Sequence, residues 1–131
     1  MSQEAQSVPG KLGGGVLGRL MRATVVSVAG LRAAWIHEAA FRQECLAAAV
    51  LVPAAFWLGQ SAVERALLIG ACLLVLIVEL LNSAIEAAVD RVGTDHHLLA
   101  GRAKDLGSAA VFMSLVLAAC TWGLIVWDRF V

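Results

Sequence analysis

The chain has 131 residues, of which 60% are hydrophobic and 15% are charged, and its mean hydropathy is +0.83. A soluble domain of this size could not bury so much apolar surface, so the composition excludes one and predicts a single membrane domain. The formal net charge of zero excludes the strongly basic surface of a nucleic-acid-binding protein and gives no sign of an acidic partner. Charges are therefore informative only through their positions.

The N-terminal part predicts a tail followed by a helix on the membrane surface. Residues 1–15 contain Pro9, Gly10 and three consecutive glycines, which is typical of a flexible tail, and they lack the features of a cleaved signal peptide. In residues 16–35 the large apolar side chains fall within about 140° of arc, as in an amphipathic helix that lies in the interface. Arg32 projects towards the apolar side, where it either snorkels to water or contacts a phosphate or headgroup.

Three transmembrane helices are predicted to follow, at about residues 38–58, 64–91 and 102–128. The uninterrupted apolar part of the first, residues 45–58, is shorter than the roughly 20 residues that a span needs. Its start must therefore include Glu38 and Glu44 near the headgroups, while Pro53 can be accommodated inside a membrane helix. Trp57, and Trp122 with Trp127, are placed as interfacial residues at the ends of the first and third spans.

The distribution of Lys and Arg predicts the orientation. Eight of these residues precede the first span or join the second to the third, against Arg65 and Arg129 on the other side. The positive-inside rule then places the N-terminus and the second loop in the cytoplasm and the C-terminus in the periplasm.

Four polar side chains interrupt the second span within Val78–Asp90. At about 100° per residue, Asn82, Glu86 and Asp90 fall within about 60° of Glu79, and the helical rise places Glu79 roughly 10 Å deeper than Glu86. An acid inside a span costs about 2.5–3.5 kcal/mol and by default marks a functional position, although a structural polar contact between helices is the alternative. A carboxylate shielded from water is a good proton acceptor, so Glu79 is a candidate general base for a lipid hydroxyl.

Other charged residues are expected at the same interface. Glu38 and Glu86 offer the hard oxygen ligands that magnesium takes together with nucleotide phosphates, although Glu38 could instead pair with Arg42. Residues 101–105, with Arg102 and Lys104, are expected to open the third helix. Cations are unfavourable at that position unless an anion docks there or they serve as positive-inside anchors.

Histidines, cysteines and small residues complete the pattern. His96 and His97 have no third ligand at metal spacing, which leaves contact with a nucleotide as the functional interpretation. The three cysteines stand singly within apolar runs and are assigned no chemistry. Small residues border the polar stripe and permit close helix packing: Ser83, Ala84, Ala87 and Ala88. Because three spans cannot easily enclose such a stripe, homo-oligomerisation is expected.

Four segments together resemble the prokaryotic diacylglycerol kinase family, the small integral-membrane lipid kinases of bacteria. They are residues 31–35 (LRAAW), 38–44 (EAAFRQE), 78–91 (VELLNSAIEAAVDR) and 101–110 (GRAKDLGSAA). The resemblance extends roughly from Arg19 to Trp127. The chain differs from the familiar enterobacterial pattern at Val26 and His96, where that pattern has aromatic residues, and at Leu98, which is often acidic.

This resemblance implies an all-α membrane protein with a surface helix and three transmembrane helices. It implies a homotrimer in the bacterial inner membrane, with active sites between subunits at the cytoplasmic interface. The implied reaction is direct transfer of phosphate from ATP, with Mg²⁺, to the hydroxyl of diacylglycerol, giving phosphatidic acid.

The resemblance also implies roles for individual residues. Glu79 would be the general base, with Asn82 and Asp90 in support, and Glu38 and Glu86 would bind the metal. The residues implied for ATP are Arg19, Glu38, Glu86, Asp95, His96, His97, Lys104 and Asp105. Those implied for the lipid are Arg19, Arg32, Trp35, Gln43, Glu44, Trp57, Arg65, Glu79, Ser108 and Trp122.

Three other functions remain as alternatives. The same scaffold supports undecaprenol kinases, and the sequence does not distinguish the two lipids. A non-enzymatic proton or ion carrier could use Glu79 as a relay, although no acid lies at membrane depth in the third span. A purely structural oligomeric subunit is the third alternative.

Overall fold

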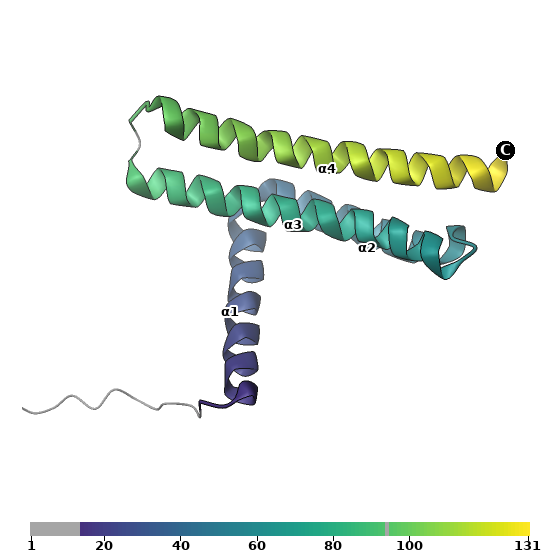
Figure 1. Ribbon diagram of the computed structural model, residues 1–131, viewed down its shortest axis with the longest axis horizontal. Helices are drawn as coiled ribbons and strands as arrows, with labels where there is room; N and C mark the ends of the chain where they lie inside the picture. Colours follow the sequence, from purple (N-terminus) through teal and green to yellow (C-terminus); the bar gives the residue numbers. More distant parts are fainter. Residues whose placement is uncertain (1–13, 94) are drawn as a thin grey trace, which may run out of the picture. The chain divides into compact units, whose positions relative to one another are not determined.

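The computed structural model describes residues 14–93 and 95–131 (Figure 1). The described chain forms four helices, α1 (Val16–His37), α2 (Ala39–Leu58), α3 (Ala62–Val92) and α4 (Leu98–Phe130). It divides into two compact units, Met1–Ala33 and Ala34–Val131. The predicted flexible tail lies, apart from Gly14 and Gly15, outside the described residues.

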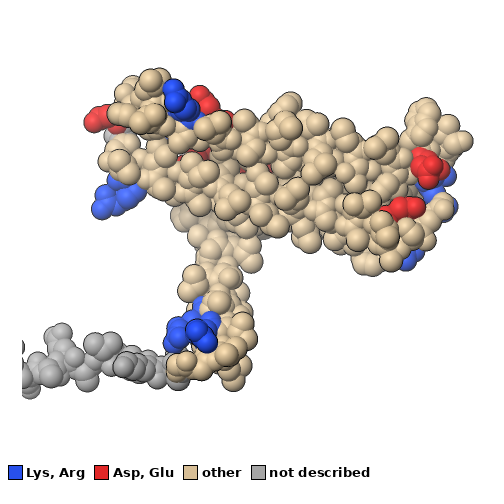
Figure 2. Space-filling model, in the orientation of Figure 1, with Lys and Arg blue, Asp and Glu red and all other residues tan. Residues whose placement is uncertain are grey.

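The predicted all-helical fold with three long apolar helices is confirmed. Each of α2, α3 and α4 is long and apolar enough to cross a membrane. At a rise of about 1.5 Å per residue, α3 and α4 exceed the roughly 30 Å of a hydrocarbon core, so their ends reach the headgroup regions. Figure 2 shows the surface of the second unit, which contains these three helices: uncharged residues cover its middle and charged side chains gather at its two ends.

The second unit is organised around α3, which packs against both α2 and α4. Helices α3 and α4 are antiparallel, because Trp122 Nε1 donates to the Leu68 carbonyl (3.2 Å) near one end and Lys104 pairs with Asp90 near the other. Leu68 is fully buried with Ala55 and Leu58 of α2. The helix that carries the polar stripe is therefore the one with the most protein around it.

The start of α3 is fixed by side-chain caps. Ser61 Oγ accepts from the Glu64 amide (3.1 Å), and Glu64 Oε2 accepts from the Gln60 amide (2.8 Å). This reciprocal arrangement satisfies amides that have no partner inside the helix. Arg65 adds a third contact, because its Nε donates to the carbonyl of Gly59 at the end of α2 (3.0 Å).

We expect Ser61→Ala to lower the free energy of unfolding by about 1 kcal/mol, because the Glu64 amide loses its acceptor. Reversible unfolding of the purified protein in mixed micelles measures the change. Ser61→Thr is the control, since it keeps the hydroxyl and should remain close to the wild type. Equal stability of all three proteins would contradict the assignment of this cap.

The expected start of the last helix is wrong. Residues 101–105 were expected to open it, but α4 begins at Leu98, with His97 as its N-cap. The Nδ1 atom of His97 accepts from the Leu99 amide (3.1 Å), a role that sequence patterns assign mainly to Ser, Thr, Asp and Asn. Arg102 and Lys104 consequently lie beyond the first turn, so an anion on the helix N-terminus does not explain these cations.

Candidate active site

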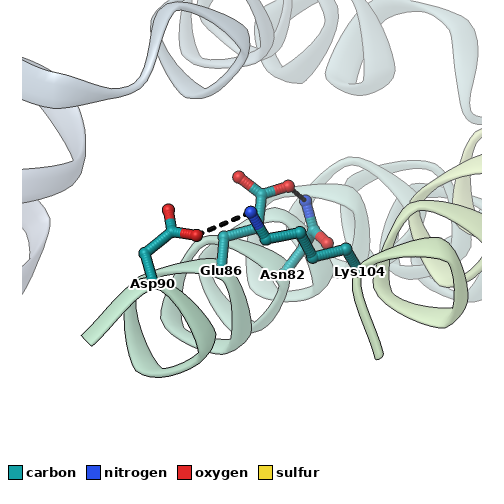
Figure 3. Close-up of polar contacts among 4 residues, drawn as sticks. All are labelled: Asn82, Glu86, Asp90 and Lys104. Carbon is teal, nitrogen blue, oxygen red and sulfur yellow. Dashed lines mark hydrogen bonds and ion pairs between the residues drawn. The ribbon is translucent and has the colours of Figure 1, made fainter. Parts of the chain in front are cut away.

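The polar stripe of α3 passes from buried to exposed along one helix face. Glu79 is only 5% exposed and Asn82 8%, whereas Glu86 is half-buried and Asp90 is exposed. Figure 3 shows Asn82, Glu86 and Asp90 along this face, with Lys104 reaching over from α4. The buried end of the stripe is thus shielded from water and the other end is open to it.

Two contacts order the side chains of the stripe. Asn82 Nδ2 donates to Oε1 of Glu86 (3.2 Å), four residues later and one turn away. Lys104 Nζ pairs with Asp90 Oδ1 (2.6 Å) across the α3–α4 interface, and its charge also interacts with that of Glu86. Lys104 therefore holds a positive charge beside two carboxylates of α3 (Figure 3).

Carboxylates from two helices form one acidic cluster, consisting of Glu38, Glu44, Glu79 and Glu86. The charge of Glu79 interacts with those of Glu38 and Glu86, and the charge of Glu44 interacts with that of Glu79. One oxygen of Glu44, Oε2, is buried and has no hydrogen-bond partner in the described structure. Like charges repel one another, so these carboxylates favour binding of a cation.

Glu38 occupies the N-cap position of α2, but its side chain makes no capping hydrogen bond. Arg42, the alternative partner for Glu38, instead donates from Nη1 to the carbonyls of Trp35 (2.8 Å) and Ile36 (3.1 Å). These carbonyls belong to the last turn of α1, where helical acceptors are left without amide partners. Arg42 thus contacts the last turn of α1 and is not paired with Glu38, whose charge interacts with that of Glu79.

The acidic cluster matches the requirements of magnesium better than those of a metal bound by protein alone. Within the described residues, no group of three His, Cys, Asp or Glu side chains is arranged to hold a metal ion. Magnesium typically takes one or two carboxylates and completes its shell with water and phosphate oxygens. Glu38 and Glu86 each carry a carboxylate of this kind, and Asn82 donates to one oxygen of Glu86.

Four of the eight residues implied for ATP line one hollow of about 500 Å³ at the α3–α4 connection. Its lining includes Asp90, Asp95, His96, His97 and Lys104. His97 uses Nδ1 as an acceptor in the α4 cap, which leaves Nε2 as the ring nitrogen that can donate to a ligand. The hollow therefore contains one ammonium group and two imidazole rings, beside the carboxylates of Asp90 and Asp95.

An apolar groove of about 280 Å³ crosses all three long helices. Glu44 lies in its lining, together with Leu51, Cys72, Ala118 and Trp122 among others. The groove therefore joins the acidic cluster to an apolar surface at membrane depth, and it includes two residues implied for the lipid, Glu44 and Trp122.

Other residues implied for the lipid lie elsewhere in the chain. Arg65 contacts Gly59 in the α2–α3 connection, and the ring of Trp57 lies 6.3 Å from that of Phe130. Both are at the opposite end of the helices from the α3–α4 connection (Figure 1), so one chain does not bring them to the acidic cluster. Arg19 and Arg32 are exposed on the first unit, and three further residues implied for the lipid are exposed on the second: Trp35, Gln43 and Ser108. Asp105, implied for ATP, is exposed there as well.

Comparison with known proteins identifies the family. Residues 25–126 match the family described as prokaryotic diacylglycerol kinase. The chain belongs to this family. The diacylglycerol kinase of Escherichia coli is 54% identical over 112 residues, covering 86% of this chain and 92% of its own length. That of Pseudomonas aeruginosa is 56% identical over 109 residues (83% and 89%), and that of Helicobacter pylori 45% identical over 105 residues (80% and 82%).

In this member of the prokaryotic diacylglycerol kinase family, sequence patterns missed three contacts around the site. They are the His97 cap of α4, the two bonds from Arg42 to the end of α1, and the close approach of Gly107 to Asn82. The first two join side chains to backbone atoms outside the usual capping patterns. The third is signalled only by a glycine that is buried inside a long helix, where glycine is a poor helix former.

Proposed function

We propose that the chain is an ATP-dependent kinase that phosphorylates diacylglycerol to phosphatidic acid at the membrane interface. The observation that carries this function is the buried carboxylate of Glu79 within the acidic cluster, in a chain of the prokaryotic diacylglycerol kinase family. Such a carboxylate meets a lipid hydroxyl from the membrane side, while the exposed end of the stripe meets a water-soluble nucleotide.

The reaction is a direct, in-line transfer. The Glu79 carboxylate accepts the proton of the lipid hydroxyl as the hydroxyl oxygen bonds to the γ-phosphorus of ATP. The bond from that phosphorus to the β–γ bridging oxygen breaks, and ADP leaves. Because positioning and charge neutralisation supply most of the catalysis in phosphoryl transfer, no covalent phosphoenzyme is needed.

Glu38 and Glu86 would hold the magnesium ion that accompanies ATP, and Asn82 orients Glu86 through its hydrogen bond. When bound, the ion neutralises charge on the phosphate oxygens. Lys104, kept in place by Asp90, adds a positive charge on the nucleotide side. Asp95, His96 and His97 complete the nucleotide site, together with Asp105, and the family resemblance implies a nucleotide contact for Arg19 as well.

The apolar groove accepts an acyl chain of the lipid, with Glu44 near the glycerol end and Trp122 further along. We expect Ala118→Phe to fill part of this groove and raise the KM for diacylglycerol about tenfold, with the KM for ATP unchanged. Initial rates at varied concentrations of each substrate measure both constants. Ala66→Phe on exposed apolar surface is the control, and equal changes in both variants would contradict the assignment of the groove.

The remaining features concern the whole assembly. Residues 16–131 form one membrane kinase domain, with the first helix on the membrane surface. Three copies assemble so that neighbouring subunits complete each active site. Residues that lie away from the acidic cluster of their own chain can then contact the lipid bound at a neighbour's site: Arg32, Trp35, Gln43, Trp57, Arg65 and Ser108. The stripe and the hollow face the cytoplasm, because the cationic segments lie at that end of the helices.

Phosphate transfer to lipid by the purified chain tests this function. With γ-labelled ATP and Mg²⁺, we expect label in phosphatidic acid, and a higher kcat/KM for diacylglycerol than for undecaprenol. If label appeared only in undecaprenyl phosphate, the lipid substrate would be undecaprenol and not diacylglycerol. Proton flux in proteoliposomes without ATP consumption would support the carrier and refute the kinase.

A further inference from the structure

Gly107 of α4 lies against Asn82 of the polar stripe. It is buried, and a Cβ placed on it would overlap Oδ1 of Asn82 and lie 3.3 Å from Cγ of the same side chain. The other glycines of α4 differ, because a Cβ at Gly101 or Gly123 meets nothing within 4 Å. Of the three glycines in α4, only Gly107 has a neighbouring side chain that leaves no room for a Cβ.

The amide of Asn82 is confined at both of its ends. Its Nδ2 donates to Oε1 of Glu86 (3.2 Å), whereas its Oδ1 faces the backbone of Gly107 and accepts no hydrogen bond from a described residue. The side chain is 8% exposed, so it has little space in which to choose another rotamer. The contact with Gly107 therefore selects the orientation that presents the amide nitrogen to Glu86.

The two helices cannot separate freely to admit a larger residue at position 107. The Lys104–Asp90 ion pair (2.6 Å) holds them on one side of Gly107, and the Trp122–Leu68 hydrogen bond (3.2 Å) holds them on the other. A methyl group at position 107 would consequently displace the Asn82 side chain rather than the helix backbone.

We infer that Gly107 is a positioning residue for the reaction: its missing side chain lets the α4 backbone orient the Asn82 amide towards Glu86. This inference rests on the proposed function, because Glu86 is there a ligand of the magnesium that accompanies ATP. It adds a role for a residue that touches neither substrate nor metal.

A double-mutant cycle over Gly107→Ala and Asn82→Ala tests the inference. At subsaturating magnesium, Gly107→Ala is expected to lower the apparent kcat about tenfold, close to the level of Asn82→Ala, because both remove the amide that orients Glu86. In the Asn82→Ala background, Gly107→Ala should change kcat less than twofold. Gly123→Ala on the same helix is the matched control and should retain the activity of the wild type.

Thermal unfolding gives a readout that does not depend on activity. Gly107→Ala should lower the midpoint in the wild-type background and leave it unchanged or raise it in the Asn82→Ala background, where the overlap is gone and alanine favours the helix. Equal losses of kcat and of midpoint in both backgrounds, or failure of the double variant to fold, would overturn the inference. If the wild type transfers no phosphate, the proposed function fails. The thermal midpoints of the wild type, the two single variants and the double variant then still test the contact between Gly107 and Asn82.

Discussion

Glu79→Gln is expected to lower kcat by about 10³-fold, because the amide keeps the volume of the carboxylate but cannot accept the proton of the lipid hydroxyl. The KM for ATP should change little, since Glu79 lies at the buried end of the stripe and the nucleotide residues lie at the exposed end. Steady-state rates at saturating diacylglycerol, varied over ATP, measure both quantities.

The same variant separates a catalytic role from a structural one. If Glu79 were a structural contact between helices, its replacement would destabilise the protein. In a catalytic role Glu79 stays buried near two other acids, so the neutral amide should leave assembly intact and the thermal midpoint equal or higher. Glu64→Gln at the other end of α3 is the matched control for turnover, and near-normal turnover of Glu79→Gln would rule out the general base.

Glu86→Gln and Glu38→Gln are each expected to raise the magnesium concentration for half-maximal rate about tenfold, because each removes one of the two charged ligands. The rate at saturating magnesium should recover in part, which distinguishes loss of a ligand from loss of the base. Rates measured over a series of free magnesium concentrations at constant ATP provide the comparison.

Glu44→Gln controls for the loss of charge from the acidic cluster. Because Glu44 is assigned to the lipid groove, its variant should keep the magnesium dependence of the wild type and change the KM for diacylglycerol instead. The assignment of Glu86 as a magnesium ligand would be refuted if Glu86→Gln had the magnesium dependence of the wild type and a reduced kcat at every magnesium concentration.

The sequence pattern of the second span contained most of the information about the stripe. Helical periodicity places Glu79, Asn82, Glu86 and Asp90 on one face, and the structure places them in order of increasing exposure along it. Hydrophobic length similarly predicts the three long helices. These features depend on regular spacing along one helix, which a single sequence contains.

Contacts between elements were not predictable in the same way. The register that sets Gly107 against Asn82 depends on how two antiparallel helices slide along each other, which periodicity leaves undetermined. The N-cap by His97 and the bonds from Arg42 to α1 use residue types with many other possible partners. The resemblance grouped Trp57 and Arg65 with Glu79, although one chain holds them near the opposite helix ends. A family pattern alone does not say which of its residues lie together within one chain.

The stereochemical course at the transferred phosphorus is the most direct test that this chain moves phosphate from ATP to diacylglycerol in a single step at the Glu79 end of the stripe. The measurement uses ATP made chiral at its γ-phosphorus with oxygen isotopes and determines the configuration in the phosphatidic acid formed. Direct in-line transfer predicts inversion. Retention, which requires a phosphoenzyme, or the absence of any transfer to diacylglycerol would contradict it.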